Sequence, residues 1–201
     1  MFIKQGIPYF LVLVALAGCG FNQPFEELMD VRGRPALAKE APSDIVVLPL
    51  MDDTGNPKVQ MVLPELRRAI YRALIGRCYT PVSLEFVDAR LGEEGGNRIF
   101  ALAALRGKFG ADAMLQVRVT GWNERKFRPA RRLRAAAEVS LLSSTTGEEL
   151  LGGRLETEVE VPGHGGIGLE MVDRMRLRAV KRLADRVVAG LPRRSSLVAG
   201  E

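Results

Sequence analysis

The amino-terminal segment constrains how the rest of the chain can be interpreted. An unbroken apolar run covers residues 9–17, after a short start that carries one positive charge at Lys4. Gly18 and Cys19 follow that run directly. A charged start, an apolar run and small residues before a cleavage point are typical of a secretory signal, so residues 1–18 are expected to be removed and to take no part in the fold. A transmembrane helix would need about 20 apolar residues, and this run is shorter.

The cysteine distinguishes this signal from an ordinary one. Small residues at positions 17 and 18 suit the narrow cleft of a signal peptidase, and the thiol that follows can take up lipid. The sequence Leu16-Ala17-Gly18-Cys19 resembles the lipobox of bacterial lipoproteins. The resemblance implies cleavage after Gly18, a diacylglycerol and an N-acyl chain on Cys19, and no other cofactor. Each buried CH₂ of an acyl chain contributes about 0.8 kcal/mol, so two or three chains hold a protein firmly at a membrane.

The residue after the cysteine and the net charge bear on location and partners. In lipoproteins generally an aspartate after the cysteine favours the inner membrane, so Gly20 implies the outer membrane, with the protein on its periplasmic face. The whole chain carries a net charge of +5. In the envelope the anionic partners are phospholipid head groups, lipopolysaccharide phosphates and cell-wall carboxylates, and we expect no nucleic-acid partner.

Helix breakers and apolar runs divide the mature chain. Proline and glycine interrupt residues 19–43, which are expected to form a lipidated tether. Residues 44–191 are long enough for one domain with a real core, and residues 192–201 are expected to be a flexible tail. Cys78 then has no intramolecular partner, and we expect it to be a small buried side chain at a helix end.

Hydrophobic periodicity predicts the elements of that domain. Strands are expected at 45–50, 79–82, 113–122, 134–142 and 149–161, and helices at 59–74, 84–91, 99–109 and 172–187. Pro64 indicates that the first turn of the first helix lies there, with 59–62 as a lead-in. The charged residues of this helix, Arg67 among them, are expected on its outer side. Gly147 suits a hairpin turn between the last two strands, and Gly152-Gly153 suggests a bulge.

The resulting element order is β-α-β-α-α-β-β-β-α. This order predicts an α/β fold with one mixed sheet of about five strands and flanking helices in two or three layers. The early crossover favours a parallel pair of strands, and the later hairpins favour antiparallel pairs.

Three segments in this order resemble a known family. They are 44–49, an opening strand that ends in Leu-Pro, 109–115, which runs from a helix end into a strand, and the hairpin turn 145–150. With the lipobox they resemble small outer-membrane lipoproteins of the curli-secretion-channel (CsgG-like) group. That group includes lipoproteins related to a meningococcal surface antigen, and its domain is similar to the amino-terminal domain of TolB.

The resemblance covers roughly residues 44–191. The family's hairpin often has an aspartate where this chain has Ser143 and Ser144, and a tryptophan where it has Leu151. Within the motif, Gly110 can end a helix in a left-handed turn, and Asp112 can accept backbone N–H bonds. The resemblance implies a non-enzymatic envelope role, as scaffold, secretion accessory or regulator of a cell-wall synthase, often in an oligomer.

Few residues suggest catalysis or metal binding. The only histidine, His164, lies between glycines, which would not hold an imidazole in place for a triad or a metal. Asp52 and Asp53 could bind a cation after the first strand, but a polar turn with a helix cap explains them more simply. The glycines of 92–96 lack the Lys-Ser/Thr of a phosphate loop. We therefore expect no metal site and no enzyme.

The strongest surface feature is a basic loop between two predicted strands. It holds aromatic and basic residues in close succession: Trp122, Arg125, Lys126, Phe127, Arg128, Arg131, Arg132 and Arg134. Such a loop suits contact with anionic lipid, with lipopolysaccharide phosphate or with an acidic partner. It could equally be a solvated hairpin loop whose arginines keep the protein soluble.

Two functions fit these features. The first is an outer-membrane lipoprotein that assists envelope assembly or export by binding other envelope proteins, with homo-oligomers expected. The alternative is a regulator that docks on a peptidoglycan synthase through its sheet edge or its final helix.

Overall fold

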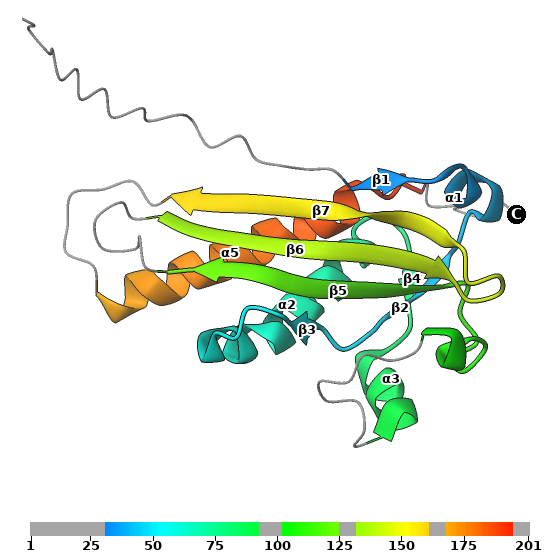
Figure 1. Ribbon diagram of the computed structural model, residues 1–201, viewed down its shortest axis with the longest axis horizontal. Helices are drawn as coiled ribbons and strands as arrows, with labels where there is room; N and C mark the ends of the chain where they lie inside the picture. The colour runs from blue at the N-terminus through cyan, green and yellow to red at the C-terminus, as the bar shows by residue number, and fades with distance from the viewer. Residues whose placement is uncertain (1–30, 93–101, 125–131, 161–167, 195–201) are drawn as a thin grey trace, which may run out of the picture.

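Three long antiparallel strands form the body of the sheet, β5 (Ala113–Asn123), β6 (Arg132–Ser143) and β7 (Glu149–Glu160) (Figure 1). Apolar and polar residues alternate along most of their length, so that one face is largely buried and the other meets water. Gly147 has a φ of 75° in the turn between β6 and β7, which confirms the predicted hairpin.

A parallel section completes the sheet. β2 (Asp44–Val47) lies between β5 and β4 (Thr80–Pro81) and is parallel to both, and β3 (Met51–Asp52) is also parallel to β5. Val46 packs into one apolar cluster while Ile45 and Val47 pack into another, so β2 is buried on both faces and its sequence does not alternate. The mixed α/β fold is confirmed, and its sheet has seven strands within the described residues where about five were expected.

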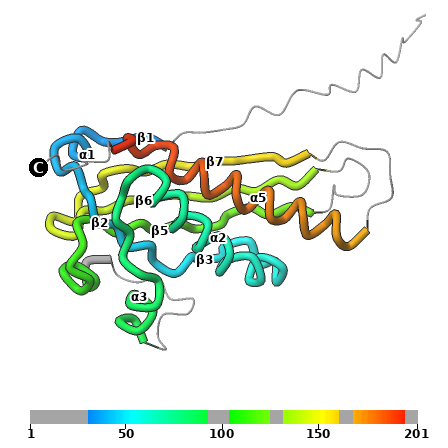
Figure 2. The backbone as a smooth tube through the Cα atoms, turned by 180° about the vertical axis from the view of Figure 1, so that it is seen from behind, coloured from blue at the N-terminus to red at the C-terminus, as the bar shows by residue number. Residues whose placement is uncertain are grey.

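Two long helices, α2 (Pro57–Ile75) and α5 (Leu169–Ala189), lie side by side on one face of the sheet (Figure 2). Their apolar stripes build most of the core between helices and sheet. From α2 these are Val59, Leu66, Ile70 and Leu74, and from α5 they are Met175, Ala179, Leu183 and Val187.

The start of α2 differs from the prediction. The helix begins at Pro57, which fixes φ in the first turn, and the Asn56 side chain caps it by accepting the Lys58 N–H at 3.1 Å. Pro64 therefore lies inside the helix. Arg67, expected on the outside, is buried and donates to the Val47 carbonyl and to Asp88.

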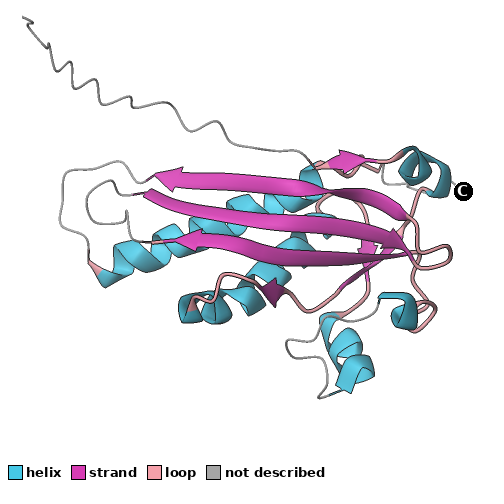
Figure 3. Ribbon diagram, in the orientation of Figure 1, coloured by secondary structure: helices cyan, strands magenta, loops and turns pink. Residues whose placement is uncertain are grey.

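Among the described residues, the other face of the sheet is covered at one end only (Figure 3). There α3 (Leu84–Leu91), found where it was predicted, and a 3-10 turn at Leu102–Leu105 pack over β2 and the start of β5. Their small cluster includes Val87, Leu91, Leu105 and Phe109. Within the described part of the predicted helix 99–109, only this 3-10 turn forms.

The computed structural model describes residues 31–92, 102–124, 132–160 and 168–194. The predicted signal, the lipidation site at Cys19, most of the glycine-rich stretch 92–96, and His164 lie outside these residues. Among the described helices, none combines the length and the apolar character that crossing a bilayer requires.

Residues 31–43 correct the predicted domain boundary. β1 (Arg32–Gly33) pairs antiparallel with β7, and α1 (Pro35–Glu40) follows it. Val31 and Leu37 are buried in the main core. The expected boundary at residue 44 is therefore wrong, because the folded domain includes at least residues 31–43.

Three smaller predictions are also corrected. Cys78 follows the end of α2 but is exposed, with a φ of 63°. The bulge expected at Gly152-Gly153 lies instead where Leu141 pairs with Leu151 and Leu142 with Glu149. In the predicted tail, Arg194 donates to the Ala41 and Pro42 carbonyls, so the chain is still held at that residue.

Candidate functional site

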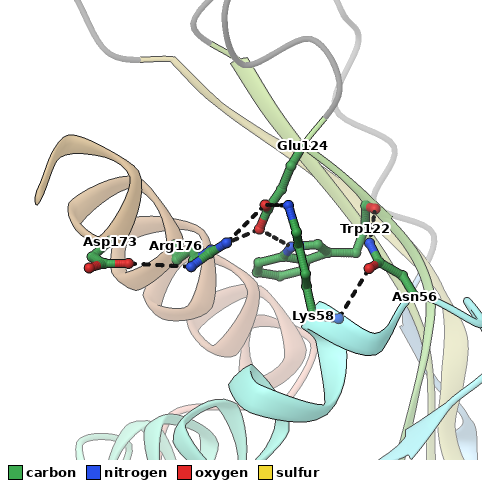
Figure 4. Close-up of polar contacts among 6 residues, drawn as sticks. All are labelled: Asn56, Lys58, Trp122, Glu124, Asp173 and Arg176. Carbon is green, nitrogen blue, oxygen red and sulfur yellow. Dashed lines mark hydrogen bonds and ion pairs between the residues drawn. The ribbon is translucent and has the colours of Figure 1, made fainter. Parts of the chain in front are cut away.

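Three elements meet at one end of the sheet. The carboxyl end of β5 lies there beside the amino-terminal turns of α2 and α5 (Figure 4). Glu124 directly follows β5, Lys58 lies in the first turn of α2, and Arg176 lies near the start of α5. The Glu124 side chain is only 10% exposed, so it needs polar partners within the protein.

Both carboxylate oxygens of Glu124 are bound. Arg176 donates from Nε to Oε1 at 2.8 Å and from Nη2 to Oε2 at 3.0 Å. The Trp122 indole Nε1–H donates to Oε1 at 3.0 Å, and Lys58 Nζ donates to Oε2 at 3.2 Å. We refer to Lys58, Trp122, Glu124 and Arg176 as the Glu124 clamp.

The clamp stabilises the ionised forms of Glu124 and Arg176. Burial alone would raise the pKa of Glu124, but the hydrogen bonds from Arg176, Trp122 and Lys58 outweigh it and lower the pKa to about 2. The hydrogen bond to Glu124 raises the pKa of Arg176. Glu124 is therefore ionised at neutral pH and cannot act as a general acid there.

Trp122 differs from the surface role that its loop suggested. Its side chain is only 6% exposed and belongs to the main core, and its carbonyl accepts from Asn56 Nδ2 at 3.4 Å. The indole therefore belongs both to the clamp and to the core, and it presents little surface to a membrane or a partner.

Five other residues of the predicted basic loop lie outside the described residues. They are Arg125, Lys126, Phe127, Arg128 and Arg131.

Arg132 and Arg134 open β6 and face acidic residues of β7. Arg132 pairs with Glu158 and Glu160, at 3.4 Å each, and Arg134 pairs with Glu156 at 3.0 Å. These cross-strand pairs neutralise much of the positive charge that the sequence suggested for this part of the loop.

A polar cavity of about 570 Å³ lies beside the clamp. It is lined by Thr54, Gly55, Asn56, Pro57, Lys58, Trp122, Asn123 and Glu124. The cavity joins the α2 cap to the clamp, and its charged side chains already bind one another.

The two aspartates before this cavity serve the turn. Asp52 accepts from the Thr54 N–H and hydroxyl and from Gln60, while Asp53 accepts from Arg118 at 3.0 Å. The polar turn that the sequence favoured is thus present, although the helix cap is Asn56. In the part of the chain that the structure describes, no group of three or more His, Cys, Asp or Glu side chains is placed to hold a metal ion.

A second polar contact holds the parallel strands. Asp112 Oδ2 accepts the backbone N–H groups of Ser43 at 2.7 Å and of Asp44 at 3.0 Å. These hydrogen bonds, first that from Asp44 and then that from Ser43, lower the pKa of Asp112. Gly110, two residues earlier, has a φ of 66°. The role expected for Asp112 is thus confirmed. Gly110 has the expected left-handed conformation, but among the described residues no helix ends at it, because the 3-10 turn of this segment stops at Leu105.

Sequence reasoning missed the clamp as a unit. Glu124 lies 52 residues from Arg176 and 66 from Lys58, so no local spacing brings them together. The available signal was weak: a single acidic residue after the tryptophan of a strand that is otherwise followed by basic residues. The arrangement joins three elements, and its four side chains bind one another, so its evident role is structural.

Comparisons with known proteins agree on the fold. Neither a family model nor a curated protein sequence matches this chain. Among solved structures, the lipoprotein GNA1162 from Neisseria meningitidis is 17% identical, with a TM-score of 0.51, over 72% of this chain and 99% of that one. The PelC dodecamer from Paraburkholderia phytofirmans is 12% identical, with a TM-score of 0.55, over 85% and 100%. At these identities the likeness shows a shared fold, so the specific resemblance to CsgG and TolB stays a prediction.

Proposed function

We propose that this chain is a lipid-anchored protein of the bacterial outer membrane, on the periplasmic side, that acts as a non-enzymatic scaffold or accessory in envelope assembly or export. One combination carries the proposal: the Leu16-Ala17-Gly18-Cys19 sequence precedes a domain with the fold of a meningococcal lipoprotein. The first part comes from the residues and the second from the structure, so the two supports are independent.

The outer edge of β7 supports a role in binding proteins. β1 pairs only with Leu151 and Gly152 of that strand. Among the described residues, the remainder of β7 up to Glu160 therefore has a strand partner on its β6 side alone. An open strand edge is a template onto which another chain can add a strand. Arg154, Glu156 and Glu158 along it would restrict which partners fit.

We also propose that the chain forms homo-oligomers. The support is the fold shared with PelC, a protein described as a dodecamer, over most of this chain. Light scattering after size-exclusion chromatography should give a mass of several chains. A single-chain mass across a wide range of concentrations would contradict this part of the proposal.

Cell fractionation with crosslinking tests the main proposal. The native protein should sediment with outer-membrane vesicles, whereas a Cys19→Ser variant should be found in the soluble fraction. Crosslinking in intact cells followed by mass spectrometry should recover envelope proteins other than enzymes of cell-wall synthesis. Recovery of a peptidoglycan synthase as the main adduct would favour the alternative role as a synthase regulator.

A further inference from the structure

The helices and the strands of this domain differ in charge. α2 and α5 together carry ten basic and four acidic residues, whereas β5, β6 and β7 together carry four basic and five acidic residues. The two helices lie on one side of the sheet (Figure 2). Positive charge is therefore concentrated on that side.

The outer surface of the helix pair consists of residues spaced three or four positions apart along each helix. On α2, positions 61, 65, 68 and 72 share one side of the helix, and on α5 positions 174, 177, 178 and 181 do the same. Between the helices lies a groove of about 410 Å³, lined in part by Ala69, Ala73, Val180 and Ala184. We define the helix face as Met61, Glu65, Arg68, Arg72, Arg174, Leu177, Arg178, Lys181 and Asp185.

Exposed apolar side chains accompany these charges. In the described chain five large hydrophobic residues are exposed, and four of them belong to α2 or α5. On the helix face, Met61 is 67% exposed and Leu177 is 57% exposed. Basic residues around exposed apolar ones are typical of helices that lie in a membrane interface.

The acidic residues of the helix face offset only part of its positive charge. Arg72 and Arg68 share Glu65, at 2.6 Å and 3.5 Å, and Lys181 pairs with Asp185 at 2.9 Å. Arg174 also pairs with Glu170, one turn earlier on α5, at 3.9 Å. Within the described residues Arg178 has no ion-pair partner, so the face retains an excess of positive charge. Two copies of this face would repel each other, which favours an anionic partner over a second copy.

The end of the tether lies close to this surface. Val31 packs at the carboxyl end of α5, where a Cβ added to Gly190 would come within 3.0 Å of Val31 Cγ1. Residues 19–30 could span at most roughly 40 Å if fully extended. That reach is comparable to the length of α5, which is about 32 Å at 1.5 Å per residue. A lipid anchor at Cys19 would therefore keep the helix face close to the bilayer.

The geometry points to the helix face as a docking surface for the anionic phospholipid head groups of the bilayer. A bilayer fits better than an acidic protein, because the basic residues are spread along both helices and the exposed apolar residues lie among them. The inference rests on the proposed function in one respect, the nearness of a membrane, and it adds a second contact beside the acyl anchor.

Vesicle binding without acyl chains tests this inference. The chain from residue 19, with Cys19→Ser, should bind vesicles that contain about one-third phosphatidylglycerol and should not bind pure phosphatidylcholine. Raising the salt from about 0.05 M to about 0.3 M should weaken binding several-fold, because exposed charges are screened. The triple variant Arg174→Gln, Arg178→Gln and Lys181→Gln should lower the partition coefficient about tenfold or more. Leu177→Ala should lower it several-fold.

A matched control separates the helix face from net charge. Arg90→Gln, Arg118→Gln and Arg154→Gln remove the same charge away from the helix face and should change binding less than about twofold. Thermal unfolding followed by circular dichroism would confirm that both triple variants are folded.

Equal losses in the two triple variants, or no loss in the helix-face variant, would overturn the inference. No binding to anionic vesicles, including the case in which only an acidic envelope protein binds, would also overturn it. Because the assay uses no acyl chain, any of these results would leave the anchor at Cys19 to be judged by fractionation.

Discussion

Arg176 binds Glu124 through two parallel hydrogen bonds, Nε to Oε1 at 2.8 Å and Nη2 to Oε2 at 3.0 Å. This bidentate geometry is the strong form of an arginine–carboxylate pair. It joins the start of α5 to the end of β5, while Lys58 brings in the start of α2. One carboxylate thus holds three elements together at one end of the domain.

Removal of this carboxylate's charge should destabilise the fold. Glu124→Gln keeps the shape of the side chain but weakens its hydrogen bonds to Arg176, Lys58 and Trp122. We expect the free energy of unfolding to fall by about 1–3 kcal/mol in urea titrations followed by circular dichroism. Glu138→Gln is the control, because Glu138 is exposed on β6 and should change stability by less than about 0.5 kcal/mol. Equal losses of unfolding free energy in Glu124→Gln and Glu138→Gln would contradict the stabilising role of the clamp.

The clamp also predicts a pH dependence. The pKa of Glu124 is lowered from 4.5 to about 2 in the folded chain, so its stabilising contribution is present above about pH 4.5. The contribution is lost as the pH falls towards 2, because the folded carboxylate then takes up a proton. The difference in unfolding free energy between native and Glu124→Gln chains should therefore shrink between pH 5 and pH 2. A constant difference over that range would show that the charge of Glu124 is not involved.

Asp112 offers a separate test at the parallel strands. Its Oδ2 accepts two backbone N–H groups at the start of β2. Asp112→Asn keeps one acceptor oxygen but loses the charge, and we expect a cost of about 1 kcal/mol. Asp112→Ala removes both bonds and should cost more, about 2 kcal/mol. If urea titrations show that Asp112→Asn is no more stable than Asp112→Ala, the acceptor oxygen that asparagine keeps would have no role.

The corrected domain boundary predicts the effect of a core substitution before residue 44. Leu37 on α1 is buried in the main core, so Leu37→Ala should lower the free energy of unfolding by about 2–3 kcal/mol. Leu169 is 85% exposed, and Leu169→Ala should have almost no effect. If thermal melts show similar small shifts for both variants, residues 31–43 would behave as part of the tether.

Most of the fold could be predicted from regular patterns in the sequence. The alternation in β5, β6 and β7 and the apolar stripes of α2 and α5 arise from side-chain periods, which a sequence displays directly. α3 was found at its predicted residues because Ser83 caps its start, by accepting the Phe86 N–H at 3.2 Å, and Gly92 ends it. Sequence reasoning was reliable where structure depends on neighbours within a turn or two.

The errors came from contacts distant in sequence. β1 and α1 are too short to show a period, and their order depends on pairing with β7 and on burial of Val31 and Leu37. Arg67 was placed outside because it is charged, but a carbonyl at the end of β2 and Asp88 on α3 provide its partners. The Glu124 clamp joins residues from three separate elements, so no local pattern could predict it.

The most direct test of the proposed lipid anchor is the intact mass of the amino-terminal peptide of the protein purified from membranes. We predict a peptide that begins at Cys19 and carries a thioether-linked diacylglycerol and an N-acyl chain. A peptide that begins at Met1, or one that begins at Cys19 with an unmodified thiol, would contradict the anchor and with it the proposed place of this protein in the envelope.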